Sequence, residues 1–127
     1  MRRLLFLAVV LCLPGGLAAR AAVQIAKTAT DCKNATTTAA MRACENARFE
    51  KADRELNAAY NDLMQQLDDG RKEKLRLAQS AWLHFRETNA DFEADAARGG
   101  TLAPLIKVTV LADMTEARTA ELKKALL

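Results

Sequence analysis

The sequence predicts an all-α protein in which two long helices form an antiparallel hairpin and two short C-terminal helices pack on it. Three observations support this fold class. Apolar residues recur at intervals of three and four over two long segments, and a glycine-containing turn separates those segments. No two strand-like runs are available to pair with each other, and a lone strand is not stable. One disulfide near the N-terminus completes the predicted fold.

Residues 1–21 have the pattern of a signal peptide. A basic start is followed by an apolar run over residues 4–13, and Ala-Arg-Ala at residues 19–21 fits the small-x-small pattern that signal peptidase cleaves. The apolar run is too short for a permanent membrane span. We therefore expect a periplasmic or secreted protein that forms one domain over residues 22–127 and keeps no stable membrane span.

The charge balance changes when the signal peptide is removed. The whole chain has 19 Lys and Arg against 16 Asp and Glu, but three of the arginines and none of the acids lie within residues 1–21. The remaining chain is therefore balanced. This composition gives no indication of nucleic-acid binding or of strong long-range electrostatic steering.

Two cysteines, Cys32 and Cys44, follow the signal peptide. An even number of cysteines in an exported chain predicts a disulfide, because the compartments outside the cytoplasm are oxidising. Two free thiols or a metal pair are the alternatives, but the single histidine of the chain leaves a closed zinc site short of ligands. We predict a Cys32–Cys44 disulfide, no bound metal and no cofactor.

Capping residues and helix breaks place the individual elements. Residues 23–36 are polar and unperiodic, which predicts a loop, and residues 36–38 are threonines that can cap a first long helix ending near Asp69. Gly70 is suited to a left-handed cap before a second helix over residues 71–97. Thr101 and Thr115 can cap a short third and a short fourth helix. Residues 106–110 alternate like a strand, but we predict a helix there because no second strand is available.

Both long segments carry a heptad pattern of apolar residues, as expected for helices that pack along their length. Folding back at Gly70 places residues opposite each other when their numbers add up to 141 or 142. The predicted contacts across the hairpin are Leu67 with Leu75, Leu63 with Ala78, Tyr60 with Trp82, Leu56 with Phe85, Asp53 with Asn89, and Phe49 with Phe92.

The only serine, tryptophan and histidine of the chain are Ser80, Trp82 and His84. If Trp82 points into the hairpin, Ser80 and His84 lie roughly 160° away around the helix and face outward. Ser80, His84 and Glu87 share one stripe and have the residue types of a hydrolase triad. A row on the outer face of one helix supplies neither an oxyanion hole nor a cleft, so we predict no catalytic residue and no enzymatic activity.

Asp53 interrupts the apolar pattern of the first helix. An unpaired buried carboxylate would cost several kcal/mol, so we predict a contact between Asp53 and Arg86 across the helices. Asn57 and Asn89 are expected in the same polar network. The network either fixes the register of the helices, which we favour, or forms a polar site that faces a ligand.

Four stretches resemble, in order and spacing, the lysozyme inhibitor LprI-like N-terminal domain family. They are ADRELNAAYNDLMQQL (52–67), LRLAQSAWLHFRE (75–87), GGTLAPLI (99–106) and MTEARTAELKK (114–124), and the resemblance covers roughly residues 32–122. It implies an exported protein that inhibits lysozyme but identifies no inhibitory residue. Family members usually carry four cysteines, and Ala90 and Val110 occupy the places of the second pair. The resemblance therefore implies that Ala90 and Val110 lie close together.

Two classes of function are compatible with these observations. The first is an exported cell-envelope binding protein that inhibits lysozyme and protects peptidoglycan. Its candidate binding face for a cationic protein is the row of His84, Glu87, Asp91 and Asp95, although an ordinary solvated stripe would look the same. The second is a structural or adaptor module that docks on another envelope protein or self-associates, without inhibiting lysozyme.

Overall fold

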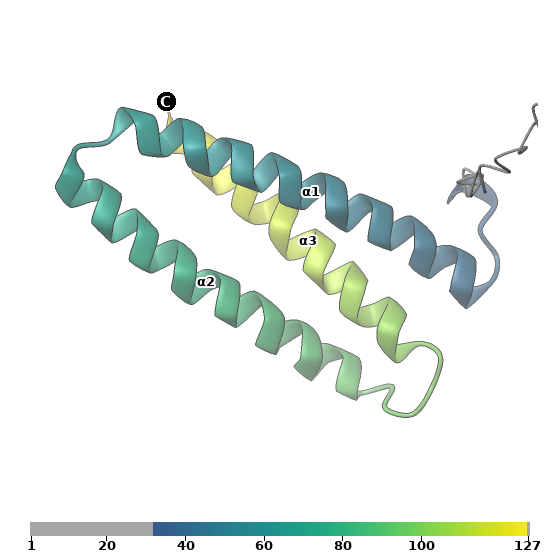
Figure 1. Cartoon of the computed structure of the whole chain (residues 1–127). Helices are drawn as coiled ribbons and strands as arrows, with labels where there is room; N and C mark the ends of the chain where they lie inside the picture. The colour runs from purple at the N-terminus through teal and green to yellow at the C-terminus, as the bar shows by residue number, and fades with distance from the viewer. Residues whose placement is uncertain (1–31, 127) are drawn as a thin grey trace, which may run out of the picture.

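The computed structural model describes residues 32–126, and all regular structure in this range is helical (Figure 1). A short 3₁₀ helix, η1 (Cys32–Asn34), precedes α1 (Thr38–Gln66), α2 (Asp69–Asp95) and α3 (Ala103–Lys124). The predicted all-α class is confirmed. The predicted signal peptide and most of the predicted N-terminal loop lie outside the described residues.

Side-chain caps define the starts of the two long helices. The Thr37 hydroxyl accepts a hydrogen bond from the Ala40 amide (3.1 Å), and the Asp68 carboxylate accepts one from the Arg71 amide (2.9 Å). The chain reverses at Leu67 and Asp68, whose backbones are extended, so Gly70 lies inside the first turn of α2 rather than in a left-handed cap. Gly99, with φ of 79°, adopts the left-handed conformation in the turn after α2.

The Cys32–Cys44 disulfide predicted from the sequence is present. It joins η1 to the second turn of α1, with 5.6 Å between the two Cα atoms. This bond lies at the end of the bundle that also holds the α2–α3 loop, whereas the α1–α2 turn and the C-terminus lie at the other end (Figure 1). The disulfide therefore fixes the start of α1 and leaves the hairpin turn unconstrained.

The C-terminal region forms one continuous helix of 22 residues, α3, in place of the two short helices expected from the sequence. Thr115 does not cap a new helix, because its hydroxyl donates to the Leu111 carbonyl one turn earlier (2.6 Å) and the side chain is fully buried. Thr119 donates to the Thr115 carbonyl in the same way (2.8 Å). Both threonine hydroxyls therefore have a hydrogen-bond acceptor in the preceding turn, and α3 continues through them without a break.

The hairpin of α1 and α2 is present, but α3 packs between its two arms (Figure 1). Both α1 and α2 pack on α3 and make little direct contact with each other. The apolar core is formed by Leu56, Ala59 and Leu63 of α1 with Leu122 of α3, and Tyr60, Leu67, Leu75, Trp82 and Leu126 pack against it.

The predicted contacts of Phe85 and Phe92 with α1 are wrong, because α3 packs between α1 and α2. Phe85 and Phe92 were expected to face α1, but they are 56% and 74% exposed. The face of α2 that packs on α3 instead contains Arg86, Ala90 and Ala94, all buried. Alanines at these positions let α3 approach closely, and the large phenylalanine side chains are left on the outside.

An arginine cluster links α1 to α3 near the surface. The Arg48 guanidinium donates to both carboxylate oxygens of Glu116 (2.8 and 2.6 Å), to Asp113 (2.5 Å) and to Glu45 (3.0 Å). The hydrogen bonds from Arg48 lower the pKa of Glu116, and those same carboxylates raise the pKa of Arg48. Glu116 therefore favours folding above its unfolded pKa, and this contribution is lost as the pH falls through its lowered folded pKa.

We predict that Arg48→Met destabilises the protein at neutral pH by about 0.5–1 kcal/mol, because it removes this cluster while keeping helix propensity. Partial exposure of the side chains (35% for Arg48 and 45% for Glu116) limits the effect. The difference from wild type should shrink in acid, as the pH falls through the lowered pKa of Glu116 and this carboxylate becomes protonated. Urea unfolding at neutral and at acidic pH measures the difference, with Arg54→Met, an exposed site on α1, as the control. A difference that grows in acid would contradict the assignment.

Candidate functional site

A buried arginine of α2 lies where the three helices meet. The Arg86 side chain is 8% exposed, and its Nη1 donates to Asp53 Oδ1 of α1 (3.2 Å) and to Thr115 Oγ1 of α3 (3.1 Å). Its Nη2 donates to Glu87 Oε1 (2.9 Å), whereas its Nε is buried and has no acceptor among the described residues. One guanidinium therefore connects all three helices.

Aromatic rings complete the surroundings of this arginine. The Arg86 guanidinium lies 5.2 Å from the ring centre of Phe49 and 5.4 Å from that of Trp82, distances at which cation–π attraction contributes about 0.5–2 kcal/mol. Arg118 of α3 also lies over Trp82, at 5.9 Å, and its Nε donates to Gln79 (3.1 Å). Trp82 was expected to lie against Tyr60. Both border the same core, but arginine side chains lie over the indole ring.

The structure brings together three of the four residues predicted for the polar network. Asp53 contacts Arg86, and Asn57 Nδ2 donates to Asp53 Oδ2 (3.3 Å). Asn89 is not brought into this group, because it faces α3 and donates to Met114 Sδ (3.5 Å). Sequence reasoning placed Thr115 as a helix cap and missed its contact with Arg86. Its spacing of four from Leu111 and from Thr119 is the signal that could have placed it on a buried face.

The candidate partner-binding row is exposed along α2. His84, Glu87, Asp91 and Asp95 are all accessible, and each carboxylate has a cation beside it. Glu87 accepts from Arg86, Asp91 pairs with Lys107 of α3, and Asp95 accepts two hydrogen bonds from Arg98 (both 2.6 Å). These bonds raise the pKa of Arg98 above its ordinary value. The row is therefore acidic in composition but partly neutralised within the chain.

Ser80 is exposed and lies about one helical turn before the exposed His84 on α2, on the same stripe, as predicted. Together with Asn57 and Tyr60 of α1 and with Arg76, Gln79 and Leu83, it lines an open hollow of about 290 Å³ between α1 and α2. The hollow exists because α1 and α2 do not close on each other. His84 and Glu87 are not part of its lining.

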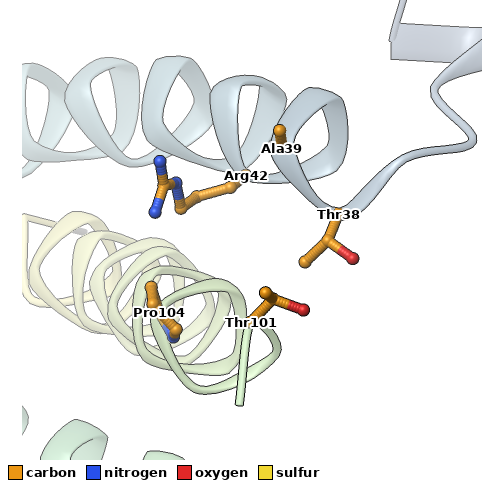
Figure 2. Close-up of a pocket in the computed structure, with 5 residues that line it drawn as sticks. All are labelled: Thr38, Ala39, Arg42, Thr101 and Pro104. Carbon is orange, nitrogen blue, oxygen red and sulfur yellow. The ribbon is translucent and has the colours of Figure 1, made fainter. Parts of the chain in front are cut away.

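A second hollow, of about 390 Å³, lies between the N-terminal ends of α1 and α3 (Figure 2). Its lining is Thr38, Ala39 and Arg42 of α1 with Thr101 and Pro104, and Arg42 is its one ionisable side chain. Such a lining provides no acid–base pair. Within residues 32–126, no group of three or more His, Cys, Asp or Glu is placed to hold a metal ion. None of the helices described for this chain is both long and apolar enough to cross a bilayer.

Ala90 and Val110, which the resemblance implies lie close together, differ in burial. Ala90 is fully buried and Val110 is half-buried. The Asp91–Lys107 and Asn89–Met114 contacts, on either side of this pair, place the two segments of α2 and α3 next to each other. Direct contact between Ala90 and Val110 stays a prediction.

We predict that Asp53→Leu lowers the free energy of unfolding by about 1–3 kcal/mol, because it leaves the buried Arg86 without its acceptor on α1. Chemical unfolding followed by Trp82 fluorescence measures the change. Asp62→Leu, at an exposed position of the same helix, is the control and should have a much smaller effect. A stabilised Asp53→Leu variant would show that the ion pair does not support the fold.

Comparison with known proteins assigns the chain to a family. Residues 29–122 match the family described as "Lysozyme inhibitor LprI". The chain is also similar to Uncharacterized protein R02472 of Rhizobium meliloti (strain 1021), with 32% identity over 107 residues, covering 74% of this chain and 77% of that protein. No solved structure matches the chain. Both similarities span most of the helical domain, and the chain therefore belongs to the lysozyme inhibitor LprI family.

Proposed function

We propose that this protein is an exported cell-envelope protein, periplasmic or secreted, that binds lysozyme and protects peptidoglycan by inhibiting it. The family match over residues 29–122 carries this proposal. The signal-like residues 1–21 and the Cys32–Cys44 disulfide support export, because disulfides persist in oxidising compartments. Inhibition of this kind requires binding to lysozyme and no catalytic step by the inhibitor.

The row of His84, Glu87, Asp91 and Asp95 is the contact face that we propose for a cationic lysozyme. The three carboxylate side chains are 48%, 63% and 52% exposed. Exposed ion pairs contribute only about 0–1 kcal/mol, so an arginine or lysine of the enzyme could replace Lys107 or Arg98 at small cost. A rigid helix loses little conformational entropy when it binds.

The position of α2 supports the same face. This helix forms one edge of the bundle, with α3 on its inner side (Figure 1). An α-helix with its side chains is about 10–12 Å across, so an edge helix forms a convex ridge, a shape that can enter the cleft of an enzyme. The proposed contact therefore blocks the cleft of lysozyme and leaves the core of the inhibitor unchanged.

A structural or adaptor role, in which the protein docks on another envelope protein or self-associates, is the second candidate. The observation that favours it is the exposure of large apolar side chains on α2, led by Phe92 at 74%. The acidic row and the exposed apolar side chains are different residues of α2, so variants at Glu87 and Asp91 test one role and variants at Phe92 test the other.

We predict that the purified protein slows lysozyme in a turbidity assay on cell-wall substrate. The double variant Glu87→Gln/Asp91→Asn should inhibit about ten-fold less well, because two carboxylates of the contact face lose their charge. Glu50→Gln/Asp62→Asn, which neutralises two exposed acids of α1, is the matched control and should inhibit like wild type.

Two outcomes would contradict different parts of this proposal. If excess wild-type protein slows neither animal-type nor bacteriophage-type lysozyme, lysozyme inhibition is wrong. If wild type inhibits and the two double variants inhibit equally well, inhibition stands and the assignment of the face to α2 is wrong.

A further inference from the structure

Three large apolar side chains of α2 are exposed on one face. Leu77 is 63%, Phe85 56% and Phe92 74% exposed. At 100° per residue they lie within an arc of about 80°, roughly 150° around the helix from the buried face that contains Gln79, Arg86 and Ala90. Single exposed apolar residues are common, but three in a row on one helix face indicate an interaction surface.

This surface, which we name the outer strip, continues without a charge from Leu77 to Phe92. Ala81 and Thr88 occupy the positions between the large side chains, and both are small and exposed. Lys74 and Asp95 extend the same line at its two ends, by the same helical geometry. The outer strip is therefore apolar in the middle, basic at its N-terminal end and acidic at its C-terminal end.

The charges of the whole helix follow the same division. Residues 69–82 contain four cations and two acids, whereas residues 83–95 contain one cation and four acids. A helix with this pattern is complementary to itself when the second copy runs in the opposite direction. A partner of uniform charge would be repelled at one end, so charge complementarity favours a second copy of this chain as the occupant of the strip.

We propose that two copies of the protein form an antiparallel dimer through the outer strip. A two-fold axis near residues 84 and 85 brings Leu77 opposite the partner's Phe92 and Lys74 opposite the partner's Asp95. Phe85 lies next to its own copy, and the small side chains of Ala81 and Thr88 allow the helices to approach. The Asp95–Arg98 pair within one chain is 52% and 79% exposed, which leaves Asp95 accessible to a second cation.

This inference goes beyond lysozyme inhibition and does not depend on it. By helix geometry Glu87 and Asp91 lie to one side of the outer strip and are left outside the dimer contact, whereas Asp95 belongs to both surfaces. Dimerisation would instead remove Phe85 and Phe92 from water, which gives their exposed position in the single chain a physical reason.

Sedimentation equilibrium of the disulfide-bonded mature protein over a range of concentrations tests the dimer. We expect a monomer–dimer equilibrium whose dissociation constant rises with salt and rises at least about ten-fold in Phe92→Glu, because that variant places a charge in the apolar strip. Met41→Glu introduces the same charge at an exposed apolar position of α1 (39% exposed) and should leave the equilibrium unchanged. A wild type that stays monomeric, or equal effects of the two variants, would overturn the proposal.

Cysteine cross-linking tests the direction of the pairing. Under mild oxidation, Phe85→Cys should form a covalent dimer because residue 85 lies beside its own copy. Leu77→Cys should not, because the two copies of residue 77 are about 22 Å apart along an antiparallel pair at 1.5 Å per residue. A mixture of Leu77→Cys and Phe92→Cys should cross-link. A covalent dimer of Leu77→Cys, with none of Phe85→Cys, would contradict the antiparallel arrangement.

Discussion

The Arg86 guanidinium is the group on which the arrangement of the three helices depends. Because α1 and α2 scarcely contact each other, the fold needs a connection that reaches from α2 to α1 across the edge of α3. Arg86 provides it through Asp53 on one side and Thr115 on the other, between the rings of Phe49 and Trp82. The Asp53 carboxylate is 42% exposed, so the pair avoids the full penalty of burying both charges.

This arrangement leaves α2 with two neighbouring exposed surfaces that share Asp95. Its inner side packs on α3 with alanines and the arginine, so its phenylalanines and carboxylates remain outside. The acidic row is the proposed contact with lysozyme, and the outer strip is the proposed contact with a second copy. Both surfaces depend on the rotation of α2 about its own axis, which the contacts of Arg86 fix. Arg86 therefore determines which side chains of α2 face outward for both proposed contacts.

Features that depend on local sequence patterns were predicted correctly. Features that depend on where α3 packs were not. The disulfide, the α1–α2 reversal and the Asp53–Arg86 contact follow from cysteine number, capping residues and the need to pair a carboxylate. The inward placement of Phe85 and Phe92 was wrong because a heptad pattern does not identify which helix covers it. The continuity of α3 was not predicted because a threonine such as Thr115 is equally typical of a helix N-cap and of a buried position bonded to its own helix.

A double-mutant cycle between Asp53 and Arg86 tests the role of the buried guanidinium most directly. Free energies of unfolding are measured for wild type, Asp53→Leu, Arg86→Met and the double variant. If the guanidinium joins α1 to α2 as described, the double variant loses less stability than the two single variants added together, by about 1 kcal/mol or more. Losses that add up to within about 0.3–0.5 kcal/mol would show that the two residues act independently and would contradict this account.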